Sequence, residues 1–180
     1  MNRKLANDEL GRMDLETFKE TSKTPIVVVL DNIRSLNNIG SVFRTSDAFA
    51  IQAIYLCGIT AQPPHREINK TALGATESVD WKYFEQTKDA LLALKEEKFT
   101  ILAVEQTENS IFLNDFKIQE NQRFALIFGH EVKGVDPAVI NLSDHVLEIP
   151  QKGTKHSLNI SVSVGVTLWD LSTKIEQLNS

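Results

Sequence analysis

The chain has 180 residues, which fits one domain, because a domain commonly holds about 100 to 200 residues. Hydrophobic residues make up 42% and charged residues 24% of the chain, a balance that excludes a disordered or collagen-like protein. The formal net charge is -5, so any nucleic-acid site must be a local basic patch. A single cysteine excludes an intrachain disulfide, and no apolar run approaches the roughly 18 residues of a membrane helix. The polar amino terminus lacks a signal-peptide core, so we expect a cytoplasmic protein.

Residues 1–24 are expected to form a helical extension ahead of one main domain at residues 25–180. Within this extension, between positions 7 and 20, apolar residues recur at an approximately helical spacing: Leu10, Met13, Leu15 and Phe18. The spacing predicts one helix that packs on the main domain.

Five short apolar runs rich in β-branched residues predict strands of a parallel sheet, at residues 26–30, 53–57, 99–104, 124–128 and 146–149. Helical patterns alternate with these runs, at residues 39–49, 88–97, 137–141 and 158–178. Asp136 and Pro137 suit the N-cap and first position of the third helix. This alternation predicts an α/β fold with parallel strand pairs. In such sheets ligands bind beyond the carboxyl ends of the strands, so the loops that follow strands should carry the chemistry.

Several common functional motifs are incomplete. Residues 129–136 begin like a phosphate loop but lack its Gly-Lys-Ser/Thr ending, and Gly134 stands where a zinc protease needs a second histidine. The four histidines and the one cysteine show no metal-ligand spacing, so we expect no metal. Neither a Gly-x-Gly-x-x-Gly run after a strand nor a Gly-x-Ser-x-Gly elbow occurs.

Two of the loops after predicted strands combine glycine with polar side chains. Asn38 and Arg44 lie in the first, where the alternatives are a simple helix N-cap for Asn38 and a solvated or ion-paired side chain for Arg44. Gly129 and Gly134 flank Glu131 in the second and allow the backbone to approach a ligand closely. The alternative there is an ordinary turn with an exposed glutamate.

A third such loop follows the last predicted strand. It leaves that strand at Ile149-Pro150, turns through Gly153 and enters a helix near Ser157. Ser157 as a simple N-cap is the alternative interpretation.

Together the three loops resemble the three sequence motifs of the SpoU (TrmH-like) branch of the SPOUT methyltransferases, which are S-adenosylmethionine-dependent RNA ribose 2'-O-methyltransferases. The resemblance covers about residues 25–171, and residues 70–75 are similar to a connecting element of the family. The matching positions are Asn38, Gly40 and Arg44 in motif one, Gly129, Glu131 and Gly134 in motif two, and Ile149, Pro150, Gly153, Ser157, Leu158, Asn159 and Ser161 in motif three.

The resemblance implies a parallel-sheet α/β/α sandwich with a deep carboxy-terminal trefoil knot. It also implies a homodimer with the site at the subunit interface and S-adenosylmethionine in the knotted pocket. By the same resemblance the cofactor would be held mainly by the backbone at Val104, Glu105, Gly129, Ile149 and Leu158.

Methyl transfer from a sulfonium to a ribose hydroxyl needs alignment and removal of the hydroxyl proton, and it needs no metal. The family assigns that proton to the motif-one arginine, here Arg44, with the cofactor supplied by the other subunit. Arginine stays protonated in proteins, so gripping a phosphate or stabilising a developing alkoxide is a second role open to Arg44. The resemblance gives the positioning of Arg44, the ribose and the cofactor to Asn38, Glu131, Ser157 and Asn159.

The RNA partner requires a basic patch on this acidic chain. The candidates for phosphate contacts are Arg34, His65, Arg66, Lys152 and Lys155, each of which has solvated charge as its alternative role. The sequence leaves open whether the substrate is tRNA or rRNA. It also leaves a second function open, a non-catalytic RNA- or S-adenosylmethionine-binding module of the same fold, although the complete motifs argue against it.

Overall fold

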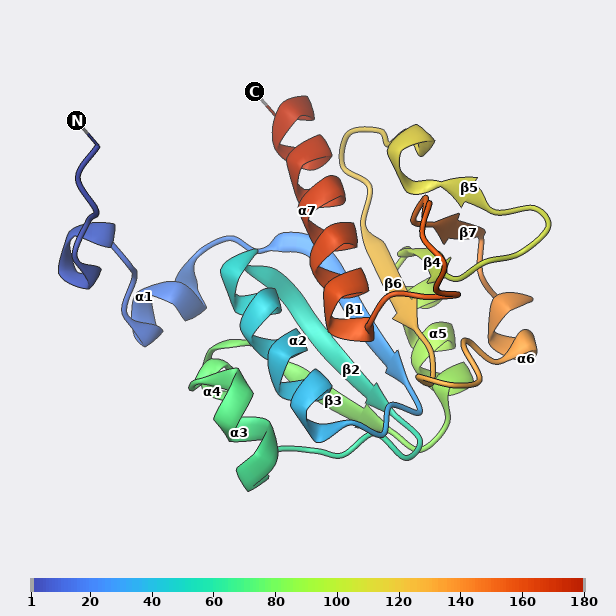
Figure 1. Cartoon of the computed structure of the whole chain (residues 1–180), viewed down its shortest axis with the longest axis horizontal. Coiled ribbons are helices and arrows are strands. Elements are labelled where there is room, and N and C mark those ends of the chain that lie inside the picture. The colour runs from blue at the N-terminus through green and yellow to red at the C-terminus, as the bar shows by residue number, and fades with distance from the viewer. Residues whose placement is uncertain (1, 180) are drawn as a thin grey trace.

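The computed structural model describes residues 2–179 and is built around a seven-stranded sheet in which every paired strand is parallel (Figure 1). The strand order is β3-β2-β1-β6-β4-β7-β5. The strands are β1 (Thr24–Asp31), β2 (Ile51–Cys57), β3 (Trp81–Phe84), β4 (Thr100–Val104), β5 (Ile111–Phe112), β6 (Phe124–Phe128) and β7 (His145–Glu148).

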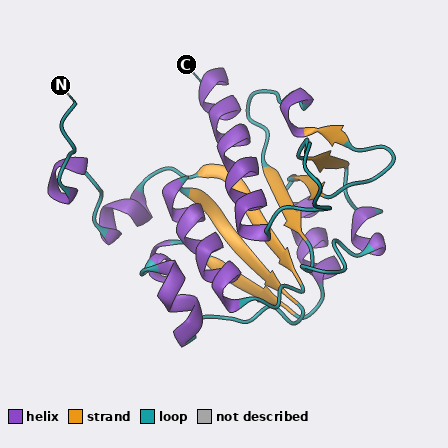
Figure 2. Cartoon of the chain, viewed as in Figure 1, coloured by secondary structure: helices purple, strands orange, loops and turns teal. Residues whose placement is uncertain are grey.

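Helices cover both faces of this sheet (Figure 2). One face carries α2 (Leu36–Ala48), α3 (Arg66–Ala72), α4 (Ala75–Ser78) and α7 (Ile160–Leu178). The other carries α5 (Thr87–Glu96) and α6 (Pro137–Ile140). The remaining elements are α1 (Leu15–Glu20) and the 3-10 helices η1 (Asn7–Leu10) and η2 (Leu113–Asp115).

The alternation of side chains along β1 explains why its sequence is apolar throughout. Val28 and its neighbours two residues away pack into the core under α2 and α7, whereas Val27 and Val29 pack into the core under α5. These side chains are fully buried, and each such burial stabilises the fold by roughly 1.5 to 3 kcal/mol. A strand buried on both faces is the pattern expected at the centre of a parallel sheet.

The predicted α/β/α architecture is confirmed, and each of the five predicted strands is present, with the bounds of β6 as predicted and those of the others within two residues. Asp136 caps α6 through a bond from the Ala138 amide, with Pro137 in the first turn, as expected. The sequence interpretation missed β3 and β5. β3 is a partly exposed edge strand and β5 has only two residues, so neither carries a long apolar signal. The trefoil knot stays a prediction.

The single helix expected between residues 7 and 20 is wrong. Gly11 adopts a left-handed φ of 60° that ends η1, and Asp14 begins α1 anew by accepting a bond from the Thr17 amide. α1 has no buried residue, although the segment lies alongside α4 (Figure 1).

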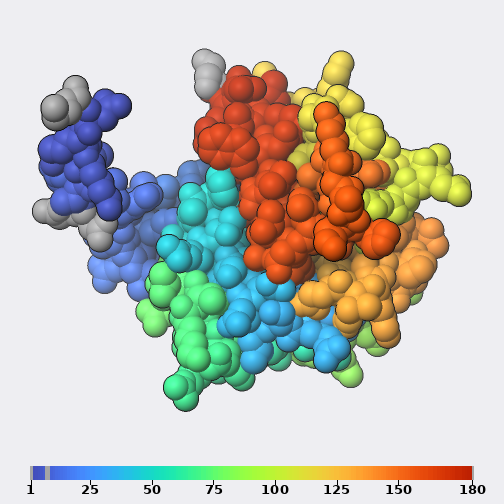
Figure 3. Space-filling view, in the orientation of Figure 1, coloured from blue at the N-terminus to red at the C-terminus, as the bar shows by residue number. Residues whose placement is uncertain are grey.

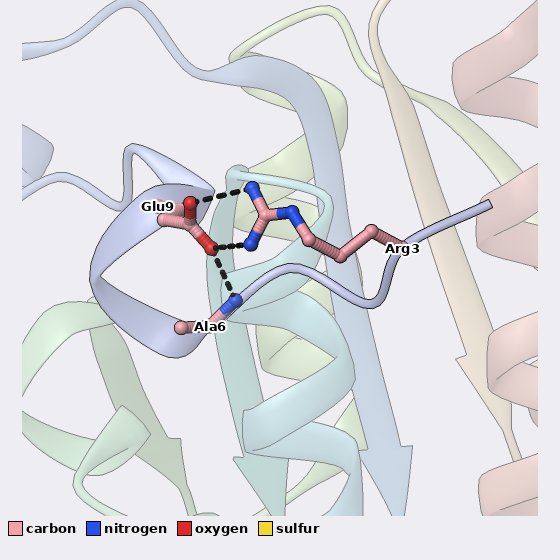
Figure 4. Close-up of polar contacts among 3 residues, drawn as sticks. All are labelled: Arg3, Ala6 and Glu9. Atoms are coloured by element: carbon pink, nitrogen blue, oxygen red, sulfur yellow. Dashed lines mark hydrogen bonds and ion pairs between the residues drawn. The ribbon is translucent and has the colours of Figure 1, made fainter. Parts of the chain in front are cut away.

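A small set of polar contacts holds the first residues of the extension together (Figure 4). The Arg3 guanidinium donates two bonds to the Glu9 carboxylate, at 3.0 and 2.8 Å, and the Ala6 amide donates a third at 2.7 Å. The Arg3 bond, followed by that of Ala6, lowers the pKa of Glu9. Both charged side chains are open to water, so this pair organises the segment without adding much to stability.

Over residues 2–179, none of the helices combines the length and the apolar character that crossing a membrane requires.

Candidate functional site

A pocket of about 680 Å³ opens where β4, β6 and β7 end. Its volume lies within the range of about 300 to 1,000 Å³ that is usual for small-molecule sites. All five residues expected to hold the cofactor line it: Val104, Glu105, Gly129, Ile149 and Leu158. The motif-three loop forms another part of the wall, and Figure 3 shows its exposed residues, coloured orange-red, on the surface beside α7.

The glycines of motif two allow the loop after β6 to fold back on itself. A Cβ added to Gly129 would lie 2.2 Å from the carbonyl carbon of Gly134 and from the Val135 nitrogen. The Gly134 amide donates to the His130 carbonyl at 2.8 Å, which closes the turn. The close approach seen here therefore joins two parts of one loop, in addition to leaving the Gly129 backbone on the pocket wall.

Glu131 connects motif two to motif one. Its carboxylate accepts bonds from the backbone amides of Arg34 at 3.2 Å and Ser35 at 2.9 Å, and from Nδ2 of Asn38 at 3.4 Å. These residues precede or begin α2, so the carboxylate fixes the start of that helix against the pocket. Glu131 is an exposed residue of a turn, as the simple alternative had it, but its carboxylate is bonded to the start of α2.

Asn38 and Asn159 extend the same network to motif three. Nδ2 of Asn159 donates to Oδ1 of Asn38 at 3.2 Å, and Oδ1 of Asn159 accepts from the amide and hydroxyl of Ser161 at 2.9 and 2.7 Å. A carboxylate only accepts and a backbone amide only donates. Glu131 at one end and Ser161 at the other therefore fix the orientation of both asparagine amides.

Two opposing effects act on the Glu131 carboxyl group. Burial raises its pKa, but the bonds from Ser35, from its own amide, from Arg34 and from Asn38 lower it by more, so the pKa lies below the usual 4.5. The ionised form is thus favoured, which suits a side chain that only accepts hydrogen bonds here.

The helix caps differ from the simple alternatives considered for two motif residues. Ser35, rather than Asn38, caps α2, and Asn159, rather than Ser157, caps α7. Ser157 lies on the pocket wall instead. Asn38 and Ser157 are therefore both free of the capping role that would have explained them structurally.

Arg44 lies away from the pocket, which is lined by Glu131, Ser157 and Asn159 and to which Asn38 is joined by hydrogen bonds. It is exposed on α2 and lines a second groove of about 600 Å³ between the amino-terminal segment and α2 to α4. Among the side chains that the structure describes, which do not include those of residues 1, 7, 8 and 180, none forms a hydrogen bond or ion pair with the Arg44 guanidinium. The structure thus gathers Asn38, Glu131, Ser157 and Asn159 and leaves Arg44 apart.

The predicted RNA contacts are dispersed. Arg34 lines a shallow depression beside Glu131 and Val132, and Lys152 and Lys155 lie in the exposed motif-three loop. His65 caps α3 through a bond from the Glu67 amide, and Arg66 begins that helix. None of the five lines the large pocket.

Sequence reasoning missed three contributions to the site. His130 Nδ1 accepts from the amides of Val132 and Lys133, at 3.0 and 3.4 Å, and shapes the motif-two turn. Lys133 places an exposed ammonium group on the pocket wall. The Glu105 carboxylate bonds to the Val135 amide at 3.1 Å. Only the adjacency of His130 and Lys133 to Glu131 in the sequence marked them out.

Among the residues that the structure describes, no group of three or more His, Cys, Asp and Glu side chains is gathered in a way that could hold a metal ion.

Comparisons with known proteins agree with this fold. The sequence model of the SpoU rRNA Methylase family matches residues 25–169. An uncharacterized tRNA/rRNA methyltransferase of Borreliella burgdorferi is 30% identical over 91% of this chain and 70% of its own length. The tRNA (guanosine(18)-2'-O)-methyltransferase of Aquifex aeolicus is 28% identical over 91% of this chain and 76% of its own length.

A solved structure, that of the A. aeolicus TrmH/SpoU tRNA modifying enzyme, superposes with a TM-score of 0.79 at 23% identity, over 92% of this chain and 82% of that one. At 23% identity, this structural similarity shows that the two proteins share a fold.

Proposed function

The chain belongs to the SpoU rRNA methylase family, and we propose that it transfers the methyl group of S-adenosylmethionine to the 2'-hydroxyl of a ribose in tRNA or rRNA. The observation that carries the proposal is the chain of bonds from Glu131 through Asn38 to Asn159. It joins residues from three distant parts of the sequence at one pocket. Such a preorganised polar network is what alignment of two reactants requires.

The pocket suits S-adenosylmethionine by its shape and by the chemistry of its wall. The apolar residues Val104, Phe128, Ile149 and Leu158 are part of its lining, which suits a flat base. The glycine turn at Gly129 brings backbone groups to the same wall. We assign the binding of this cofactor to Val104, Glu105, Gly129, Ile149 and Leu158. When bound, the cofactor supplies an electrophilic methyl group.

The residues of this chain have separate tasks in the proposed reaction. Glu131, Asn38 and Asn159 hold the starts of α2 and α7 in place through their shared bonds. Ser157 offers a hydroxyl at the pocket wall. A guanidinium is a permanent cation, so Arg44 supplies fixed positive charge that stabilises the ribose oxygen as its proton leaves, or that holds the adjoining phosphate.

The same proposal includes a homodimer in which Arg44 of one copy serves the pocket of the other. The separation of Arg44 from the large pocket within one chain supports this arrangement. A stripe of exposed apolar side chains on α7 supplies a surface for the second copy: Val162, Val166 and Trp169. Trp169 is 65% exposed although it is a large aromatic residue, which is typical of an interface.

The test is transfer of a labelled methyl group to unmodified total tRNA and, in parallel, to rRNA, followed by digestion to nucleosides. We expect label in a 2'-O-methylnucleoside from one of the two pools. Arg44→Ala should abolish transfer while the affinity for S-adenosylmethionine stays within about twofold. Lys88→Ala, which removes an exposed charge from α5, is the matched control and should be active. Cofactor binding without transfer to either pool would favour the non-catalytic module instead.

A further inference from the structure

The Glu105 side chain joins two loops of the pocket. Glu105 directly follows β4, and its backbone amide donates to the Leu147 carbonyl of β7 at 3.0 Å. One carboxylate oxygen accepts from the Gln106 amide at 2.8 Å, and the other accepts from the Val135 amide at 3.1 Å. The carboxylate is thus held on the β4 side and reaches the end of the motif-two loop.

Gly134 provides the space that this carboxylate occupies. A Cβ at Gly134 would lie 2.3 Å from Oε2 of Glu105, and the φ of Gly134 is +70°. Both facts favour glycine, and the first depends on Glu105 alone. Val135, the next residue, is buried in the core under α5 and α6. The end of the loop is therefore fixed by apolar burial and by the Glu105 bond together.

The motif-two loop is consequently held at two points. Glu131 ties its middle to the start of α2, and Glu105 ties its end to β4. The segment from Gly129 to Val135 forms one continuous part of the pocket wall. Its position against the opposite wall thus depends on both carboxylates.

We propose that Glu105 is a positioning residue whose carboxylate sets the motif-two loop for binding of the cofactor. This inference rests on the proposed function. It gives the Glu105 side chain a role in addition to the cofactor binding expected of the Glu105 backbone. In this role Glu105 neither accepts nor donates a proton. Glu105 acts before the reaction, through the affinity of the pocket, so its removal should change KM for S-adenosylmethionine and leave kcat nearly unchanged.

Glu105→Ala is the test variant, and Glu108→Ala is its matched control. Glu108 is an exposed carboxylate in the same loop, with no bonded partner within residues 2–179. We expect Glu105→Ala to raise KM and Kd for S-adenosylmethionine about tenfold, the size expected from the loss of a charge-assisted hydrogen bond, with kcat within about twofold of wild type. Glu105→Gln keeps one acceptor oxygen, so its KM and Kd for S-adenosylmethionine should lie between those of wild type and those of Glu105→Ala. Glu108→Ala should match wild type.

Hydrogen exchange separates this inference from the function on which it rests. The Val135 amide should exchange faster in Glu105→Ala than in wild type or Glu108→Ala, with or without any ligand. Unchanged exchange, or faster exchange with unchanged cofactor affinity, would overturn the positioning role. If the wild-type protein binds no S-adenosylmethionine while the exchange result holds, the contact is real but the proposed function fails, and the inferred role for the cofactor fails with it.

A double-mutant cycle adds a geometric check. Gly134→Ala should weaken cofactor binding less in the Glu105→Ala background than in wild type, because the carboxylate that collides with the new Cβ is then absent. Equal losses in both backgrounds would count against the contact.

Discussion

Replacing Asn159 by aspartate breaks the bond between motifs one and three without removing the cap of α7. Aspartate caps helices as well as asparagine does, so its carboxylate keeps the bonds from the Ser161 amide and hydroxyl. It has no donor for Oδ1 of Asn38, and it places a second acceptor where Nδ2 now lies, 3.2 Å away. The loss of one hydrogen bond costs about 1 kcal/mol and acceptor repulsion adds to this. We expect the free energy with which the network aligns the site to fall by about 1 to 2 kcal/mol, which corresponds to roughly a tenfold fall in the transfer rate.

The assay is single-turnover methyl transfer with saturating cofactor, together with thermal unfolding of the same samples. Asn159→Asp should lower the rate about tenfold and the melting temperature by about 2 to 8 °C, the shift that a loss of 1 to 2 kcal/mol gives at this chain length, and by no more than this because the cap persists. Asn109→Asp introduces the same charge at an exposed asparagine outside the pocket lining and should behave as wild type. A wild-type rate for Asn159→Asp would show that this bond does not align the site. A fall in melting temperature well beyond the expected one would show that the substitution also damages the α7 cap.

Three further expectations follow from the geometry. Gly129→Ala should destabilise the fold by about 1 to 3 kcal/mol in urea titrations and abolish binding of S-adenosylmethionine, since its Cβ would lie 2.2 Å from the backbone of Gly134. Because the pKa of Glu131 is depressed, its contribution to stability is present above the ordinary value of 4.5 and is lost as pH falls through the lower folded value, so over this interval wild type should lose stability more steeply than Glu131→Gln. Burial raises the pKa of the Cys57 thiol to about 12, so at pH 8 a thiol reagent should react at the unfolding rate, and rapid labelling of the native protein would contradict this.

The sequence was informative where one physical signal dominated. Runs such as residues 26–30 are apolar on both faces, so a central parallel strand was the consistent interpretation. The three polar loops each follow a strand, and the carboxyl ends of parallel strands lie at one edge of a sheet. This rule alone predicts that Glu131 and Asn38 approach each other, as they do at 3.4 Å.

The sequence was less informative where the outcome depends on contacts between distant residues. The roles of Ser35 and Asn159 as caps could not be distinguished from those of Asn38 and Ser157, because serine and asparagine both stabilise helix starts. The break of the amino-terminal helix depends on the left-handed conformation of Gly11, which glycine permits but does not require. The contact of Glu105 with Val135 joins residues 30 positions apart and left no local pattern.

The spacing within motif one explains why one copy of the chain does not present all of its proposed catalytic residues to one pocket. An α-helix turns about 100° and rises about 1.5 Å per residue, so Arg44, six positions after Asn38 on α2, lies about 9 Å along the axis and about 120° around it. Asn38 faces Glu131 and Asn159, and Arg44 faces the amino-terminal groove.

The proposed homodimer would bring Arg44 of one copy to the pocket of the other, and this arrangement makes a quantitative prediction. Arg44→Ala and Gly129→Ala homodimers should each be inactive, because one lacks the arginine and the other lacks a usable pocket. A heterodimer of the two, isolated after co-expression with different tags, contains one site in which an intact pocket meets the Arg44 of the other copy. Its transfer rate should be about half that of wild type per dimer, because one of two equivalent sites is restored. A heterodimer without activity would show that Arg44 acts within its own chain, and the α2 spacing would then require a large rearrangement on RNA binding.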